Sequence, residues 1–394
     1  MWRRQFNIEV LIGGSFSAKT RDDTELIPPG RAYFNGGNME IKIIEAAPHE
    51  RKPRPDQGKL GFGKYFSDHM FTMKYKEGKG WYDPVIEPYH HLVLDPTAMC
   101  FHYGQEIFEG LKAYRGAADE IYLFRPMENI RRMNASAARL CMAQIDEEIF
   151  FEALKKLITL DSSWIPKEKG SSLYIRPTLI ATEAALGVHP SDEYLFFIIT
   201  GPVGAYYAQG FSPTKIYVSS EYVRAAPGGT GAVKAAGNYA ASLYATSIAV
   251  DMGYTQVLWL DARENKYVEE VGTSNIFFLI GDELITPPLG GTILPGITRD
   301  SVISLAAHLG VKVVQRPLAI DEVIRALEAG TLKESFASGT AAIISPVGHI
   351  FYRGKEYAIN GGKTGELSQA LFNEILQIQY GMKEDPFGWR IRVL

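Results

Sequence analysis

Strand-like and helix-like patterns of apolar residues alternate along the first half of the chain. Short runs rich in β-branched and aromatic residues are followed by segments whose apolar residues recur every three or four positions. This alternation is typical of mixed α and β structure. The pattern predicts strands at 121–124, 172–176 and 195–199 and helices at 127–140 and 148–161. Pro177 is expected to end the second of these strands.

The second half repeats the mixture after a stretch rich in turn formers, residues 201–213. Strands are predicted at 215–218, 256–260 and 275–279 and helices at 239–251, 299–308 and 366–380. We therefore expect a smaller α/β domain at 39–207 and a larger domain at 208–394. Residues 1–38 have no sustained periodicity and are interpreted as a leader outside the fold. Translation starting at Met39 is one hypothesis for them.

Composition restricts the class of partner. The 394 residues are 46% hydrophobic and 12% aromatic, enough for a large core in two domains. With 41 basic and 45 acidic residues the net charge is -4, and the basic residues are scattered. This excludes the electrostatic footprint of a nucleic-acid or anionic membrane partner and favours a small molecule. No apolar run is long enough for a membrane helix. Two cysteines, Cys100 and Cys141, are too few for a disulfide framework and favour the cytoplasm.

One lysine lies among small residues that allow another group to approach the backbone closely. Lys234 is preceded by Pro-Gly-Gly-Thr-Gly-Ala-Val and followed by Ala-Ala-Gly-Asn-Tyr. A Walker phosphate loop would need Ser or Thr directly after a Gly-Lys pair, whereas the sequence here is Val233-Lys234-Ala235. On its own, the segment could also be a surface loop with a solvated lysine.

The residues that follow indicate whether Lys234 belongs to a binding site or to a solvated surface loop. Residues 269–278 and 284–299 contain an acid, a small residue, an Asn followed by apolar and aromatic residues, a Thr, and then Leu-x-Gly-Ile-x-Arg. This pattern resembles the signature of the class IV aminotransferases, the fold-type-IV pyridoxal-phosphate enzymes. From about residue 41 onward the chain is similar to the branched-chain amino acid aminotransferases. Further matching runs are at 62–63, 66–70, 108–113, 172–177, 204–206 and 338–341.

The resemblance implies two α/β domains with the active site between them, the larger one binding pyridoxal 5'-phosphate. Lys234 matches the lysine that bonds to the cofactor and then moves a proton between the substrate α-carbon and cofactor C4′. Glu270 matches the carboxylate that keeps the pyridine nitrogen protonated, and Tyr239 the hydroxyl that binds the phenolic oxygen.

Other matched positions imply the rest of the cofactor site. Arg132, the backbone N–H groups of Ile297 and Thr298, and Thr340 match the phosphate site. A helix N-terminus and an arginine fork are both suited to an anion. Arg224 and Thr273 match two further residues near the cofactor. Taken alone, Arg132 could equally be part of a solvated pair with Arg131.

The resemblance also implies a substrate pocket. An aromatic wall suits branched apolar side chains, while an arginine or tyrosine hydroxyls suit the second carboxylate of an acidic co-substrate. Taken singly, each aromatic residue could instead belong to the core. The turn Thr340-Ala341 is expected to offer backbone donors to the substrate carboxylate. The matched positions are Phe62, Tyr103, Phe108, Tyr174, Arg176, Tyr206, Thr340 and Ala341.

Four further features bear on assembly and on rival sites. Leu186-Gly187-Val188 resembles the interdomain loop that reaches the neighbouring subunit's site, which implies a homodimer. Ala342 and Ser345 stand where mammalian relatives carry a Cys-x-x-Cys pair, so no thiol switch is expected. No metal site is predicted, because adjacent His90 and His91 would point to opposite faces of a strand. Asp68-His69 is interpreted as structural.

The resemblance and the matched site residues imply transfer of the amino group of L-leucine, L-isoleucine or L-valine to 2-oxoglutarate. The products would be a branched 2-oxo acid and L-glutamate, formed by a ping-pong mechanism. A D-amino acid aminotransferase and an aminodeoxychorismate lyase are alternatives on the same fold. A protein that keeps this fold without catalytic activity is an alternative from another class.

Overall fold

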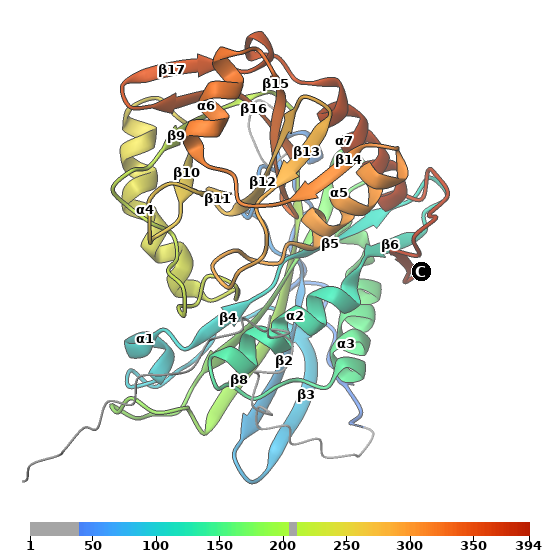
Figure 1. The fold of residues 1–394 in the computed structure, drawn as a ribbon. Helices are drawn as coiled ribbons and strands as arrows, with labels where there is room; N and C mark the ends of the chain where they lie inside the picture. The colour runs from blue at the N-terminus through green and yellow to red at the C-terminus, as the bar shows by residue number, and fades with distance from the viewer. Residues whose placement is uncertain (1–38, 205–210) are drawn as a thin grey trace, which may run out of the picture.

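Two nine-stranded sheets, each with helices of its own, build the molecule (Figure 1). The computed structural model describes residues 39–204 and 211–394. The predicted leader, the predicted boundary after residue 207, and Tyr206 lie outside these residues, so the division of the chain into domains stays a prediction. The mixed α and β architecture is confirmed.

The first sheet is antiparallel except at one edge, where β1 (Lys42–Ile43) runs parallel to β3 (Gly80–Pro88). Its order continues through β2, β8, β7, β5 and β6 to β18, and β4 also pairs with β7. The last strand comes from the end of the chain, so residues far apart in sequence share this sheet. The remaining bounds are β2 (His69–Lys76), β4 (Glu106–Phe108), β5 (Leu111–Arg115), β6 (Ile121–Phe124), β7 (Ser172–Ala181), β8 (Glu193–Val203) and β18 (Arg390–Arg392).

The second sheet has the order β11-β10-β9-β16-β15-β12-β13-β14, with β17 paired to β16. Its parallel pairs include β9 with β10 and β13 with β14. Each of these two pairs is joined by a crossover that contains a helix. The bounds are β9 (Thr214–Val218), β10 (Gln256–Leu260), β11 (Val268–Val271), β12 (Ser274–Ile280), β13 (Glu283–Thr286), β14 (Lys312–Gln315), β15 (Leu332–Gly339), β16 (Ile343–Tyr352) and β17 (Lys355–Ala358).

Helices cover the sheets and deliver residues to the space between them (Figure 1). α2 and α3 lie against the first sheet, while α4 and α5 form the two crossovers of the second. The Asp146 carboxylate caps α3 by accepting hydrogen bonds from the N–H groups of Glu148 and Ile149. The helices are α1 (Met99–Tyr103), α2 (Pro126–Arg139), α3 (Glu147–Leu160), α4 (Ala236–Asp251), α5 (Ile297–His308), α6 (Ile320–Glu328) and α7 (Glu366–Gln379), with short 3-10 turns at η1 (Gln57–Lys59), η2 (Ser162–Trp164) and η3 (Asn360–Gly362).

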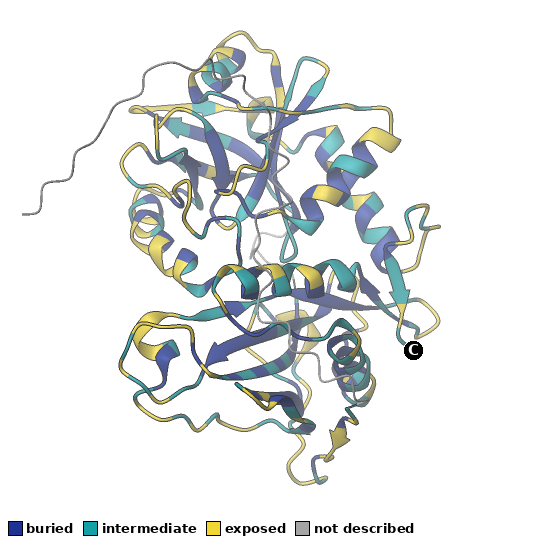
Figure 2. Ribbon diagram, turned by 60° about the horizontal axis from the view of Figure 1, so that its bottom comes forward, coloured by how far each residue is buried: buried dark blue, intermediate teal, exposed yellow. Residues whose placement is uncertain are grey.

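The sheets carry the core. Their strands are mostly buried, whereas the outer faces of the helices are exposed (Figure 2). In the first half, Phe71, Phe150 and Phe196 are buried between the sheet and α3. In the second half, Phe277 and Phe336 stack at 5.1 Å between ring centroids. Each half has an apolar cluster of its own, and a third cluster, which includes Tyr114, Phe124, Phe277 and Phe336, joins the two halves.

The predicted helices agree with the structure to within three residues at their ends, but one strand prediction is wrong. The strand that begins at Ser172 does not end before Pro177; it continues as β7 to Ala181. The carbonyl of Pro177 accepts a hydrogen bond from the Glu109 N–H, at the gap between β4 and β5. In a strand, the N–H and C=O of one residue face the same neighbour. The N–H that Pro177 lacks would therefore face the gap between β4 and β5, where no hydrogen bond of the sheet needs it.

Candidate functional site

A cavity of about 490 Å³ lies between the two sheets. β4, β7 and α2 bound it on one side. The start of β12, the start of α5 and the turn between β15 and β16 bound it on the other. The structure thus brings residues from both halves of the chain into one site. The predicted residues that line it are Phe62, Phe108, Arg132, Tyr174, Arg176, Lys234, Tyr239, Glu270, Thr273, Ile297, Thr298, Thr340 and Ala341.

Lys234 lies immediately before α4, with its backbone fixed from two sides. Its N–H donates to the Ser136 hydroxyl at 3.1 Å, and its carbonyl accepts from the Phe108 N–H at 3.1 Å. The side chain extends along the first turn of the helix, so that Nζ donates to the Tyr239 hydroxyl at 3.0 Å. The Phe108 ring centroid is 5.2 Å from the same nitrogen. The amine is thereby held in an aromatic setting that opens onto the cavity.

A buried acid lines the cavity. Glu270 is at the hairpin of β11 and β12, paired in register with Asn275, whose side-chain amide donates to Glu270 Oε1 at 3.1 Å. Burial raises the pKa of the Glu270 carboxyl to about 7, although the charge of Arg224 opposes that rise. Arg224 does not line the cavity; it lies behind Glu270, with Nε 2.7 Å from Oε2. Its Nη1 donates to the carbonyl of Thr292 at 2.9 Å.

An arginine held by a second buried acid also lines the cavity. Arg132 on α2 donates through Nε and Nη2 to the two carboxylate oxygens of Glu109, at 2.7 and 2.9 Å. Burial alone would raise the pKa of Glu109, but the Arg132 charge and its hydrogen bonds lower it overall. Nη1 also donates to the Pro295 carbonyl at 3.1 Å. A guanidinium has five donor hydrogens, so the fork is fixed in place with donors left over for an anion.

The N-terminus of α5 also faces the cavity. Ile297 and Thr298 are the first two residues of this helix, and Gly296 is its N-cap. The first N–H groups of a helix have no partner within the helix and lie at the positive end of its dipole. A side chain at Gly296 would place Cβ 1.9 Å from the Asn275 Oδ1 atom, so this position requires glycine. Thr340, on the turn after β15, lines the cavity with them.

Aromatic residues form the wall near Arg176. The rings of Phe62 and Tyr174 meet edge to face at 4.9 Å. Arg176 donates through Nη2 to the Tyr174 hydroxyl at 3.0 Å, and its guanidinium lies 4.5 Å from the Phe108 ring centroid. A side chain at Gly110 would place Cβ 2.1 Å from that hydroxyl, so glycine here leaves room for the tyrosine. The wall combines apolar surface with one cation.

Tyr103 does not lie with the other predicted residues. It ends α1, is 40% exposed and does not line the cavity of its own chain. Because α1 is a short helix held to the segment after β7 through the Met99 N–H and the Glu183 carbonyl, its last residue projects outward. The substrate-binding role of Tyr103 stays a prediction, as does that of Tyr206.

Three residues that the sequence reasoning did not select contribute to the site. Glu109 orients Arg132, Asn275 orients Glu270, and Glu106 lines the cavity from β4. Burial raises the pKa of Glu106, with the Arg176 charge opposing it. Glu109 and Asn275 both belong to runs that match the family pattern, so a signal for them was present in the sequence. The sequence could not indicate which side chains these residues contact.

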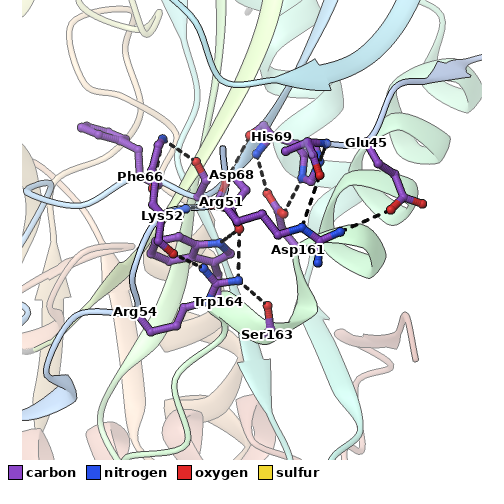
Figure 3. Close-up of polar contacts among 12 residues, drawn as sticks. Glu45, Arg51, Lys52, Arg54, Phe66, Asp68, His69, Asp161, Ser163 and Trp164 are labelled. Atoms are coloured by element: carbon purple, nitrogen blue, oxygen red, sulfur yellow. Dashed lines mark hydrogen bonds and ion pairs between the residues drawn. The ribbon is translucent and has the colours of Figure 1, made fainter. Parts of the chain in front are cut away.

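Asp68 and His69 lie away from the cavity, in a network of polar contacts (Figure 3). His69 Nδ1 lies 2.7 Å from the Asp161 carboxylate, while Nε2 accepts from the Ala46 N–H at 2.8 Å. Asp68 accepts from the Trp164 indole and from the Lys52 N–H, both at 2.8 Å. These contacts fasten the segment before β2 to the first sheet, consistent with the structural interpretation.

The described residues also bear on metal and membrane functions. Among residues 39–204 and 211–394, no group of three or more His, Cys, Asp or Glu side chains is arranged to hold a metal ion. Over the same part of the chain, no helix has the length and apolar character needed to cross a membrane.

The residues present fit pyridoxal phosphate. Glu270 Oε2 is buried and lies close to Arg224 Nε. Within the described residues, this oxygen accepts no hydrogen bond. Such an oxygen suits a protonated ring nitrogen. The donors of Arg132 and of the α5 N-terminus suit a phosphate. Lys234 and Tyr239 lie on the cavity wall as well, as an amine and a hydroxyl for the ring's aldehyde and phenolic groups.

Comparison with known proteins agrees with this chemistry. The family model described as amino-transferase class IV matches residues 106–350. The chain is 54% identical over 343 residues to branched-chain-amino-acid aminotransferase 2 of Bacillus subtilis (strain 168), a match covering 87% of this chain and 94% of the relative. It is 48% identical over 338 residues to the branched-chain-amino-acid aminotransferase of Mycolicibacterium smegmatis, covering 84% and 92%.

Solved structures give the same result. The branched-chain amino acid aminotransferase of Escherichia coli superposes with a TM-score of 0.68 at 27% identity, covering 83% of this chain and 99% of that one. The branched-chain amino acid aminotransferase from T.th., in complex with N-(5'-phosphopyridoxyl)-L-glutamate, gives 0.66 at 27% identity, covering 85% and 99%. The chain therefore belongs to the class IV aminotransferases, a family of pyridoxal-phosphate enzymes, and within them to the branched-chain-amino-acid aminotransferases.

Proposed function

We propose that this chain transfers the amino group of L-leucine, L-isoleucine or L-valine to 2-oxoglutarate and forms L-glutamate. The observation that carries the proposal is the set of groups gathered around one cavity. A buried carboxylate, a lysine, an arginine and a helix N-terminus all line it. Relatives about half identical to the chain carry the corresponding name.

Lys234 is proposed as the residue that carries the proton. As a neutral amine, Nζ would take the proton from the substrate α-carbon and deliver it to C4′ of the cofactor. The Tyr239 hydroxyl, 3.0 Å from Nζ, orients the amine for both steps. Bound pyridoxal phosphate supplies the electron sink for the carbanion that proton removal leaves.

Glu270 and its neighbours are proposed to set the charge at the ring nitrogen. An anionic carboxylate favours a protonated nitrogen, and a protonated ring withdraws electrons more strongly. The pKa of Glu270 is about 7, because burial raises it and nearby charges lower it only in part, so a cation beside the carboxylate favours the ionised form. Arg224, 2.7 Å from Oε2, supplies that cation without entering the cavity.

Substrate choice is proposed to follow from the wall near Arg176. Phe62, Phe108 and Tyr174 can remove a branched aliphatic side chain from water, which is favourable by about 1.5–3 kcal/mol for a fully buried leucine. The acidic co-substrate needs a cation for its second carboxylate instead. Arg176 Nε is buried and has no hydrogen-bond partner within the described residues, so a donor remains available.

We also propose a homodimer in the cytoplasm as the working form. Phe101, Leu186 and Val188 are apolar and 62%, 68% and 87% exposed. They belong to α1 and the segment after β7, which the bridge between Ala98 and Ala184 joins. A second copy would cover this surface and let Tyr103 reach a pocket that its own chain does not offer it.

Steady-state kinetics of purified, cofactor-loaded protein test the proposal. L-leucine, L-isoleucine and L-valine with 2-oxoglutarate should each give L-glutamate, with parallel lines in double-reciprocal plots. D-alanine with 2-oxoglutarate serves as the matched comparison and should give no product. Turnover of D-alanine alone would assign the chain to D-amino acid aminotransfer, and release of pyruvate from 4-amino-4-deoxychorismate would assign it to the lyase reaction.

A further inference from the structure

A buried lysine outside the cavity links the two halves of the molecule. Lys112 lies on β5 of the first sheet and is 7% exposed. Its Nζ donates to the carbonyl oxygen of Ala341 at 2.7 Å, across 229 positions of sequence. Within the described residues no carboxylate forms an ion pair with it, and burial lowers its pKa to about 8. Burying a lysine without an ion pair is unfavourable, so we expect its hydrogen bond to Ala341 to have a function that offsets this cost.

Ala341 belongs to the turn that joins β15 and β16. Thr340, Ala341 and Ala342 all line the cavity. Lys112 does not; it lies behind the turn, in a small hollow that it shares with Thr298 and Thr340. The lysine and the bound substrate would therefore be on opposite sides of the same stretch of backbone.

The turn contains a strained residue. Ile343 has φ of 63°, in the left-handed region that β-branched residues avoid. Such a conformation costs about 1–3 kcal/mol and persists only where the surroundings hold it. Gly339 and Ile343 pair across the hairpin, which fixes the base of the turn but not its tip. The hydrogen bond from Lys112 acts at the tip.

That bond also fixes the direction of a donor. In a trans peptide the C=O and the following N–H point to opposite sides. Holding the Ala341 carbonyl toward Lys112 therefore directs the Ala342 N–H away from the lysine, on the side where the cavity lies. A neutral amine still donates hydrogen bonds, so Lys112 can hold the turn in either protonation state.

We infer that Lys112 is a positioning residue for recognition of the substrate α-carboxylate, acting by fixing the peptide between Ala341 and Ala342. This inference rests on the proposed function. It assigns to Lys112 no contact with substrate or cofactor. The turn presents its donors correctly only while the lysine holds the carbonyl behind it.

The test compares Lys112→Met with the same change at Lys333, an exposed lysine on β15. Methionine is an unbranched side chain one atom shorter than lysine, and it has no donor. We expect KM for L-leucine and for 2-oxoglutarate to rise roughly tenfold, the effect of one hydrogen bond. The dissociation constant for pyridoxal phosphate should rise less than KM does, because Arg132 and the α5 N-terminus keep their contacts and Thr340 is the one expected phosphate-binding residue on the turn. Lys333→Met should match the wild type.

A second measurement separates positioning from general damage to the fold. The wild-type holoenzyme should bind 4-methylvalerate more tightly than its neutral amide, and Lys112→Met should lose most of that preference. Lys112→Arg, which keeps a donor, should retain part of it. If Lys112→Met does not fold, Lys112→Gln replaces it, because its amide is one atom too short to reach the carbonyl. An unchanged preference in a folded Lys112→Met or Lys112→Gln protein would overturn the inference, whereas failure of the wild type to transaminate would refute the proposed function instead.

Discussion

Replacing Glu109 by glutamine should weaken both the fold and the hold on the cofactor phosphate. The Glu109 side chain is fully buried and receives two hydrogen bonds from Arg132, at 2.7 and 2.9 Å. Breaking a buried ion pair by removing one partner costs about 3–5 kcal/mol. Glutamine keeps one acceptor, so we expect a loss of about 3 kcal/mol, which lowers Tm by roughly 6–12 °C for a domain of this size.

The effect on cofactor binding follows from the same geometry. Without the second carboxylate oxygen, the Arg132 fork is free to turn from the phosphate. The loss of one charge-assisted hydrogen bond is about 1.5–3 kcal/mol, or roughly 10- to 150-fold in the dissociation constant. Thermal unfolding of the cofactor-free protein and absorbance titration with pyridoxal phosphate measure the two effects separately.

Glu128→Gln is the matched control for this experiment. Glu128 lies on α2 beside Arg132, but its side chain is 39% exposed and its ion-pair contacts are long, 3.7 Å to Arg131 and 3.9 Å to Arg125. Exposed pairs contribute about 0–1 kcal/mol, so this variant should behave nearly as the wild type. A Glu109→Gln protein with the Tm and cofactor affinity of Glu128→Gln would refute the reasoning about Arg132.

Three further predictions address the lysine, the buried acid and the aromatic wall. Lys234→Ala should abolish transamination while near-ultraviolet circular dichroism stays unchanged, and turnover by the folded variant would exclude Lys234 as the essential base. The pKa of Glu270 is raised from 4.5 to about 7 in the folded state. As the pH rises between these values, the unfolding free energy of the cofactor-free wild type should therefore fall relative to that of Glu270→Gln, by up to about 3 kcal/mol. Denaturant titrations at pH 5 and pH 8 measure this fall, and a difference that does not change with pH would contradict it. Gly110→Ala should displace Tyr174, because the new Cβ would lie 2.1 Å from its hydroxyl, and should raise KM for 2-oxoglutarate severalfold; kinetics like the wild type would show that the wall can adjust.

Local pattern was enough for much of the fold. The helices at 127–140 and 148–161 were predictable because their periodicity and flanking residues lie within a few positions of each other. The strand through Pro177 was not, because the gap between β4 and β5 that tolerates it is formed by residues more than sixty positions earlier in the chain. Interruptions of this kind depend on the neighbouring strand and leave no signal in the strand itself.

The candidate site divides in the same way. Lys234, Glu270 and Arg132 were found through spacing and the family pattern, and all three line the cavity. The residues that orient these three side chains were not found from the sequence, because the contacts are long-range. Arg132 meets Glu109 across 23 positions, and Arg224 reaches the Thr292 carbonyl across 68. Sequence could suggest which groups do chemistry, whereas only the packed structure shows what fixes their orientation and charge.

The central claim is that this site exchanges an amino group with branched L-amino acids. The visible spectrum of purified, cofactor-loaded protein, recorded before and after adding L-leucine alone, tests it most directly, with D-alanine in a parallel sample. We predict that L-leucine converts the absorbance of the lysine-bound cofactor to that of pyridoxamine phosphate, and that D-alanine leaves it unchanged. Conversion by D-alanine only, or by neither amino acid, would contradict the account.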